Sequence, residues 1–165
     1  PSGAVTTTSH VLCLGDNYTN AFYCADTTIS SSDFRDKTDI EDFTAGLEFV
    51  KSMRPVTYQW DHRSRYIDQL DADGNRVYEE SVALTDINPD GTLKDSKIHV
   101  GFISQEVEAL EKSIGFATSK NNQLFCNTNE DDTSMGLKYE RFTAVLVNAI
   151  KELSAKVDDI NTRLQ

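Results

Sequence analysis

Two side chains that could carry chemistry lie five positions apart, the hydroxyl of Ser32 and the amine of Lys37. A serine hydroxyl becomes a nucleophile when a neighbouring base accepts its proton. A lysine amine can be that base if burial or a nearby cation disfavours its charged form. Asp33, which follows the serine, is also typical of a turn that caps a helix, and in that case the lysine is simply solvated. These residues alone leave both interpretations open.

The composition limits what else this chain of 165 residues could do. Its formal net charge is −11 at pH 7 and its isoelectric point is about 4.6. Nucleic acids and anionic membranes repel such a protein, so we expect neither as a partner. No apolar run approaches the roughly 20 residues of a membrane span. The first residue is Pro1, and we expect the chain to be part of a longer protein.

Cysteine and histidine residues are too scattered to predict a metal site. Cys13, Cys24 and Cys126 are an odd number without metal-like spacing, which favours a reducing compartment over a disulfide framework. The sequence from Asp71 to Asn75 resembles the start of a calcium loop. It lacks the closing glutamate at position twelve, so a hairpin turn is the better interpretation. We therefore expect no metal and no cofactor.

The first half of the chain predicts short strands around one helix. Residues 1–31 are rich in Ser, Thr, Asn and Gly and contain two β-prone runs, which suggest a hairpin. Thr38 and Glu41 can form a capping box ahead of apolar residues at helical spacing up to Val50, which predicts a helix. Residues 56–60 alternate β-branched and aromatic side chains with polar ones and predict a strand.

The second half continues the alternation of short elements. Residues 61–97 are polar and carry two turn signals, so we expect an insertion that projects from the core. A strand is predicted over 98–104, a short helix that begins with residues 105–110, and one more strand over 124–126. The fold class is therefore α+β, with a small mixed globular domain over residues 32–138.

The strongest structural signal lies at the C-terminal end, from 139 to 165, where no glycine or proline occurs. Apolar residues recur there at alternating steps of four and three, the a and d positions of a heptad repeat: Leu146, Ile150, Leu153, Val157, Ile160 and Leu164. An isolated helix of this length is marginal in water, so self-association is the preferred interpretation. Packing against its own domain is the alternative, and the pattern does not choose between two and three strands.

Four separate stretches, taken in order, resemble a known family: residues 32–37, 54–60, 100–107 and 139–153. Together they resemble the C-terminal intramolecular chaperone auto-processing domain, the peptidase S74 family, of phage tailspikes, tail fibres and neck appendages. The resemblance implies a trimeric coiled coil, with two copies of the same chain as partners. Residues 1–31 would then be the end of an upstream fibre or spike domain of that chain.

The resemblance also implies a reaction at the serine and the lysine. Ser32 would attack the carbonyl of Ser31, the residue before it, with Lys37 as the general base. The chain would thus be a single-turnover serine endopeptidase that cuts its own Ser31-Ser32 bond. An ester intermediate and a direct dyad mechanism both remain open.

Four further residues could support this reaction. Asp33 would orient the turn, and Arg35 would disfavour the charged form of the lysine. Gly101 and Gln105 match the second motif, and we expect their region to approach the site, where an oxyanion stabiliser is needed. Alternatively, Gly101 is only a close-packed strand residue and Gln105 only a helix cap.

A second function fits the same sequence. The domain could be a permanent trimeric cap of a viral fibre that is never cut and that displays its insertion to a receptor. In both cases we expect assembly in the host cytoplasm and a parent protein in the virion tail or an appendage. The intact mass of the protein separates the two functions.

Overall fold

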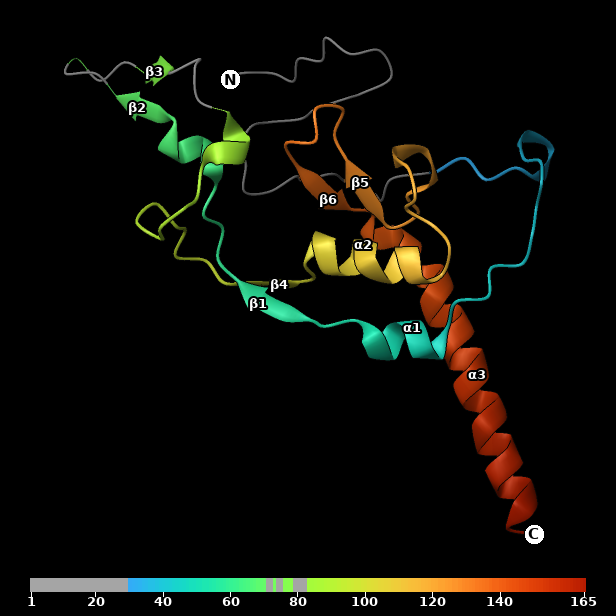
Figure 1. Ribbon diagram of the computed structural model, residues 1–165. Coiled ribbons are helices and arrows are strands. Elements are labelled where there is room, and N and C mark those ends of the chain that lie inside the picture. The colour runs from blue at the N-terminus through green and yellow to red at the C-terminus, as the bar shows by residue number, and fades with distance from the viewer. Residues whose placement is uncertain (1–29, 71–72, 74–75, 79–82) are drawn as a thin grey trace.

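The computed structural model describes residues 30–70, 73, 76–78 and 83–165, and it has mixed helices and small antiparallel sheets (Figure 1). The hairpin predicted near the N-terminus lies outside these residues. The α-helices are α1 (Leu47–Ser52), α2 (Ser104–Ser113) and α3 (Phe142–Arg163). The strands are β1 (Val56–Tyr58), β2 (Asp68–Leu70), β3 (Arg76–Tyr78), β4 (His99–Gly101), β5 (Cys126–Thr128) and β6 (Met135–Leu137). Single turns of 3-10 helix occur at Phe34–Asp36, Arg63–Tyr66, Leu84–Asp86, Lys120–Asn122 and Tyr139–Arg141.

The strands pair as three two-stranded antiparallel sheets, β1 with β4, β2 with β3, and β5 with β6. The strand predicted over 56–60 is confirmed but ends at Tyr58, and the one predicted over 98–104 spans only His99–Gly101. It stops early because the next backbone amide, that of Phe102, donates to the hydroxyl of Tyr139 (3.2 Å) and the chain then enters α2. The third predicted strand lies two residues later than expected, as β5.

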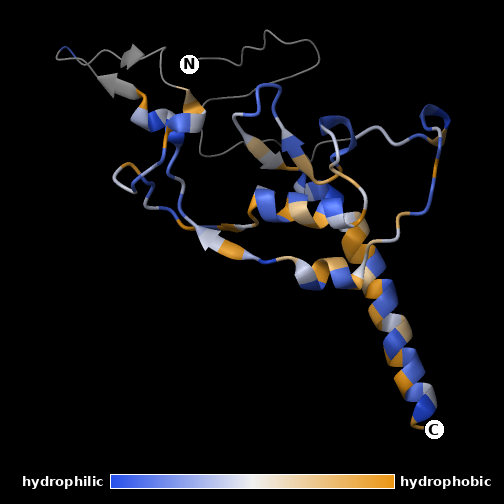
Figure 2. Cartoon of the chain, viewed as in Figure 1, coloured by the Kyte–Doolittle hydropathy of each residue, from blue (hydrophilic) through white to orange (hydrophobic). Residues whose placement is uncertain are grey.

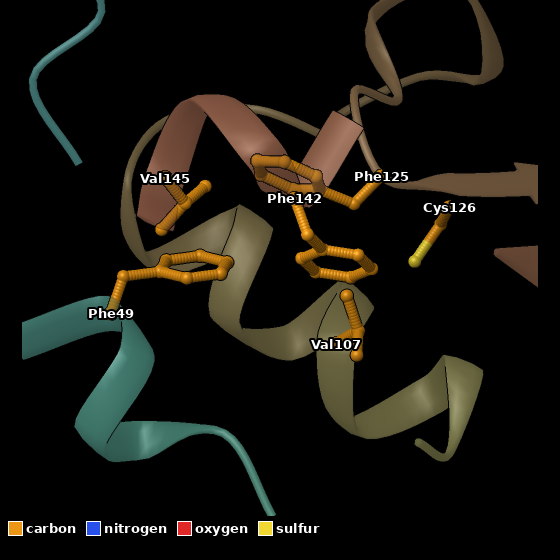
Figure 3. Packing of buried hydrophobic residues seen from close by; sticks show 6 residues of the cluster. All are labelled: Phe49, Val107, Phe125, Cys126, Phe142 and Val145. Atoms are coloured by element: carbon orange, nitrogen blue, oxygen red, sulfur yellow. The ribbon is translucent and has the colours of Figure 1, made fainter. Parts of the chain in front are cut away.

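Six buried residues from distant parts of the chain form the core, with Figure 3 showing how they meet. They come from α1, α2, α3 and the entry to β5, and they are Phe49, Val107, Phe125, Cys126, Phe142 and Val145. The rings of Phe125 and Phe142 stack with centroids 5.0 Å apart. This aromatic packing holds the start of α3 against the sheets and the two shorter helices.

Buried within this core is a charged residue, Glu111 of α2, whose exposed fraction is 0%. Its carboxylate accepts hydrogen bonds from the backbone amides of Leu124, Phe125 (3.1 Å) and Cys126 (2.9 Å). A buried carboxylate is costly unless it is hydrogen-bonded, and three amide donors satisfy it here. The side chain therefore ties α2 to the chain that enters β5.

The helix predicted from Thr38 is wrong at its start, since α1 begins only at Leu47. Asp39 has φ of 49°, a left-handed backbone conformation that interrupts a helix, and Ile40 is 58% exposed instead of facing the core. The cap of α1 comes from elsewhere: a Glu152 carboxylate oxygen on α3 accepts from the Leu47 amide (3.2 Å). Gly46 permits this approach, because a β-carbon there would collide with that carboxylate.

The predicted C-terminal helix is confirmed as α3, and it has two different apolar faces. Phe142, Val145 and Ala149 are buried against the rest of the chain. The six heptad residues on the adjacent face are 48–81% exposed: Leu146, Ile150, Leu153, Val157, Ile160 and Leu164. Figures 1 and 2 show the second half of α3 standing clear of the domain with hydrophobic residues along it. We call these six residues the heptad stripe; their pairing in a coiled coil stays a prediction.

The region predicted to be an insertion contains the hairpin β2–β3, which Figure 1 shows on the side of the molecule away from α3. The pairing of Leu70 with Arg76 confirms a hairpin at the predicted turn. Arg65 and Asp95 form an ion pair (2.8 Å) across this region. No helix in the described part of the chain is both long and apolar enough to span a bilayer.

Candidate active site

The structure brings Ser32 and Lys37 together, since the lysine Nζ donates a hydrogen bond to the serine Oγ over 2.7 Å. The 3-10 turn Phe34–Asp36 between them explains this contact. The turn reverses the chain, and the backbone amide of Lys37 closes it by donating to the carbonyl of Phe34 (3.1 Å). A hydroxyl at this distance from an amine could pass it a proton once the amine is neutral.

Asp33 caps the turn and binds Arg35. One carboxylate oxygen of Asp33 accepts from the backbone amide of Arg35 (2.9 Å), and the guanidinium donates to both oxygens (3.0 and 2.7 Å). These hydrogen bonds lower the pKa of Asp33 and raise that of Arg35. The two opposite charges largely cancel, so Arg35 does not act as an uncompensated cation beside Lys37. The role that the sequence suggested for Arg35 is thus not provided within one chain.

The pair lies on an exposed segment, residues 30–42, which we call the arm. Every residue of the arm is exposed, and its hydrogen bonds within the described part of the chain all join arm residues to each other. Phe34 is 76% exposed, although it is a large apolar side chain. Water around an amine favours its charged form, which cannot accept a proton. The arm alone therefore lacks the surroundings that a lysine base needs.

Gly101 and Gln105 do not join the arm within one chain. Gly101 is buried in β4, and Figure 1 shows the arm on the opposite side of the molecule from β1 and β4. A β-carbon at Gly101 would lie 2.5 Å from the hydroxyl of Tyr139, so this glycine allows a tyrosine to approach the strand. Gln105 is exposed in the first turn of α2, and the helix cap is Ile103 instead. The expectation that this region approaches the serine is wrong for a single chain.

Gln105 instead lines an open pocket of about 540 Å³, which we call the aromatic cleft. Its walls include four aromatic side chains and Met135, the aromatic ones being Tyr58, Trp60, Phe102 and Tyr139. Trp60 is 44% exposed and Tyr139 is 49% exposed. Sequence reasoning missed this cleft, although the alternation in residues 56–60 does place Tyr58 and Trp60 on one face.

Within the described residues, no group of three or more His, Cys, Asp or Glu side chains could hold a metal ion. Cys126 is buried, and its burial, with Glu111 beside it, raises the pKa of the thiol to about 12. A thiol that stays protonated is a poor nucleophile. Ser32 and Lys37, which share a hydrogen bond, are thus the candidate nucleophile and base.

Comparison with known proteins gives a match to a family model. The family model described as Peptidase_S74, chaperone of endosialidase, matches residues 32–115, just over half of the chain. The matched segment contains Ser32, Lys37, Gly101 and Gln105. No curated protein matches the sequence.

Proposed function

Because the chain belongs to the chaperone of endosialidase family, Peptidase S74, we propose that it is an intramolecular chaperone that trimerises and then cuts itself free. It would bring three copies of an upstream phage fibre or spike into register and release them by cleaving the Ser31-Ser32 bond. The observation that carries this proposal is the 2.7 Å hydrogen bond between Lys37 Nζ and Ser32 Oγ. It supports the pairing of nucleophile and base that such a cleavage requires.

The proposed reaction proceeds through an ester. As the Ser32 Oγ attacks the Ser31 carbonyl carbon, Lys37 takes the hydroxyl proton and the carbonyl oxygen becomes an oxyanion. The oxyanion collapses, the carbon–nitrogen bond breaks, and the proton passes to the Ser32 nitrogen. Water then hydrolyses the ester between Ser31 and the Ser32 side chain, which releases a new C-terminus at Ser31 and restores the hydroxyl.

The heptad stripe supports the proposed trimer. Its six apolar side chains are about half exposed or more in one chain, and burying that exposed part between three helices would contribute roughly 5–10 kcal/mol per chain. Assembly has a kinetic benefit, because joining three chains at one end makes later pairings effectively intramolecular. Release afterwards prevents the fibre from unfolding back along the route by which it assembled.

Intact mass tests the cleavage. We expect freshly made protein to lose residues 1–31, and we expect Ser32→Ala and Lys37→Ala to stay whole. Asp36→Ala is the matched control within the same turn, because Asp36 makes no side-chain hydrogen bond there. Hydroxylamine, which attacks esters, should speed the cleavage of the parent protein. A parent chain that remains whole while it still trimerises would leave the second candidate, a permanent trimeric cap.

That second candidate rests on one observation, the complete exposure of the arm in a single chain. A dyad in water, with no oxyanion donor beside it, would be inactive however short its hydrogen bond. The protein would then hold fibre ends together and could display residues 61–97 to a receptor. For either candidate we propose assembly in the host cytoplasm and a parent protein in the virion tail or an appendage.

The oligomeric state is tested separately by sedimentation. Ile150→Asp places a charge in the heptad stripe and should convert trimers into monomers. Ala155→Asp adds the same charge on the opposite side of α3 and should leave the trimer intact. If Ile150→Asp has no effect on sedimentation, the stripe is not the contact between copies.

A further inference from the structure

We propose that the arm of one copy docks in the aromatic cleft of a neighbouring copy, so that the active site is completed between two chains. This inference rests on the proposed trimer and adds a surface, an occupant and a residue to it. Phe34 would be the apolar anchor of the arm, and Gln105 of the neighbouring copy would donate to the oxyanion.

The cleft has two features that the arm lacks, an apolar surface and a hydrogen-bond donor. Ser32 and Lys37 need surroundings that exclude water and a donor for the developing negative charge. The cleft has walls of aromatic side chains, and Gln105, whose amide can donate hydrogen bonds, lies in its lining. Phe34 and Ile40 are 76% and 58% exposed on the arm, so the described part of the chain leaves most of both apolar side chains uncovered.

The charge in the cleft is compatible with this occupant. Asp61 is the one charged residue of the lining, and its carboxylate already accepts from the hydroxyl of Tyr66 (2.9 Å) and the amide of Gly91 (2.9 Å). On the arm, Asp33 and Arg35 neutralise each other. Docking would therefore not set the Asp33 carboxylate against an unpaired carboxylate of the lining, and the other acidic residues of the arm follow Arg35 on the side away from Ser32.

The cleft also lies next to the start of α3, the helix that carries the heptad stripe. Tyr139 lines the cleft and lies in the 3-10 turn that leads directly into α3, which begins at Phe142. A surface that packs three α3 helices together would therefore lie next to the wall of the cleft that Tyr139 forms. That continuity favours a second copy of this chain as the occupant.

The arm is long enough to reach that copy. Its root is fixed to α3, where the side chain of Asn148 donates to the carbonyl of Phe43 (2.6 Å). The chain from Phe43 back to Lys37 lies outside the turn that joins Lys37 to Ser32, and it can extend to roughly 20 Å at about 3.3 Å per residue. Neighbouring helices in a bundle are only about 10 Å apart, so the serine can reach beyond the next helix.

Cross-linking between two differently sized chains tests the docking. Both chains carry Ser32→Ala, Cys13→Ser and Cys24→Ser; one adds Asp36→Cys, beside the anchor Phe34, and the other adds Gln105→Cys. We expect mild oxidation to give a cross-linked species that contains one chain of each size. Leu93→Cys, at a position that is 43% exposed and outside the cleft, replaces Gln105→Cys as the control and should give no such product.

The outcomes separate this inference from the proposed function. A trimer in which no mixed product forms, or in which Leu93→Cys reacts equally well, overturns the docking and leaves the chaperone standing. A protein that sediments as a monomer overturns both. Because Trp60 is the one tryptophan in the sequence, its fluorescence gives a second readout. Assembly should protect Trp60 from acrylamide, and Phe34→Ala should abolish that protection while Ile98→Ala does not.

Cleavage in mixed assemblies tests the role of Gln105. Removing an oxyanion donor slows a reaction by about 10²- to 10³-fold, so Gln105→Ala homotrimers should cleave that much more slowly. Mixing them with Ser32→Ala chains, which retain Gln105, should restore cleavage of the Gln105→Ala chain. If cleavage of that chain remains slow in the mixture, then Gln105 acts within its own chain or only stabilises the fold, and the shared site is refuted.

Discussion

Replacing Gly101 by alanine should destabilise the protein through a single contact. The new β-carbon would lie 2.5 Å from the Tyr139 hydroxyl, and the strand cannot shift freely because it pairs with β1. Overpacking of this kind costs about 1–3 kcal/mol, and replacing glycine in a strand returns roughly 0.5–1 kcal/mol. We therefore expect Gly101→Ala to lower the free energy of unfolding by about 1–2 kcal/mol.

Removing the tyrosine hydroxyl should rescue this defect. In Tyr139→Phe the nearest atoms to the new β-carbon are Tyr58 Cε1, at 3.4 Å, and Cζ of residue 139, at 3.6 Å, which are ordinary van der Waals distances. The single variant loses the hydrogen bond from Phe102, which is worth about 0.5–1.5 kcal/mol. The double variant should then be about as stable as Tyr139→Phe alone, a coupling of roughly 1–2 kcal/mol.

Urea unfolding, followed by Trp60 fluorescence, measures all four proteins. Trp60 packs edge-on against Tyr58 (centroids 5.1 Å apart) and so reports on the sheet that contains Gly101. The Ser32→Ala background prevents cleavage, and a fixed protomer concentration keeps the contribution of assembly constant. Destabilisations that simply add would refute the contact between Gly101 and Tyr139 as the cause.

Three further predictions concern the buried groups. Glu111→Ala removes the acceptor of three backbone amides in the core, and thermal unfolding should show that the free energy of unfolding falls by about 3–5 kcal/mol. Glu111→Gln keeps one acceptor oxygen and should cost less. Cys126, whose pKa burial raises to about 12, should react with iodoacetamide at pH 9 only when denaturant unfolds the chain; rapid labelling of native protein would contradict its burial. Burial, with a contribution from Arg65, lowers the pKa of His62, so the unfolded chain binds the proton more readily than the folded chain. The free energy of unfolding should therefore fall as the pH drops below about 6.5, and it should level off below the pKa of the folded chain. Stability above pH 7 should not depend on this group, and His62→Gln should flatten the acid slope in urea titrations.

Local sequence patterns predicted the elements whose causes are local. The heptad spacing predicted α3, and the alternation before Trp60 predicted β1. The hydrogen bond between Ser32 and Lys37 follows from their spacing of five positions and from the turn between them, and the sequence indicates both. The strand ends could not be placed, because a tyrosine 37 residues away takes the amide that would continue β4.

Tertiary contacts decided the features that the sequence did not predict. The start of α1 depends on Glu152, which lies 105 residues from the amide that it caps, so a capping box at Thr38 was a misleading signal. The exposure of the arm and its separation from Gly101 depend on how the whole chain packs. The burial of Glu111 could have been predicted from the sequence. It follows Val107 by one helical turn, which places a charge on the buried face of α2.

Because a carboxylate on α3 caps α1, the stability of the shorter helix depends on the longer one. Six residues are far too few to stay helical unaided, so α1 should form and open together with α3 around Glu152. In hydrogen exchange, the Leu47 amide should report the opening of α3 rather than local fraying. The two helices thus behave as one cooperative unit, and the arm is joined directly to it. An event that loosens α3 near Glu152 therefore also frees the root of the segment that carries Ser32.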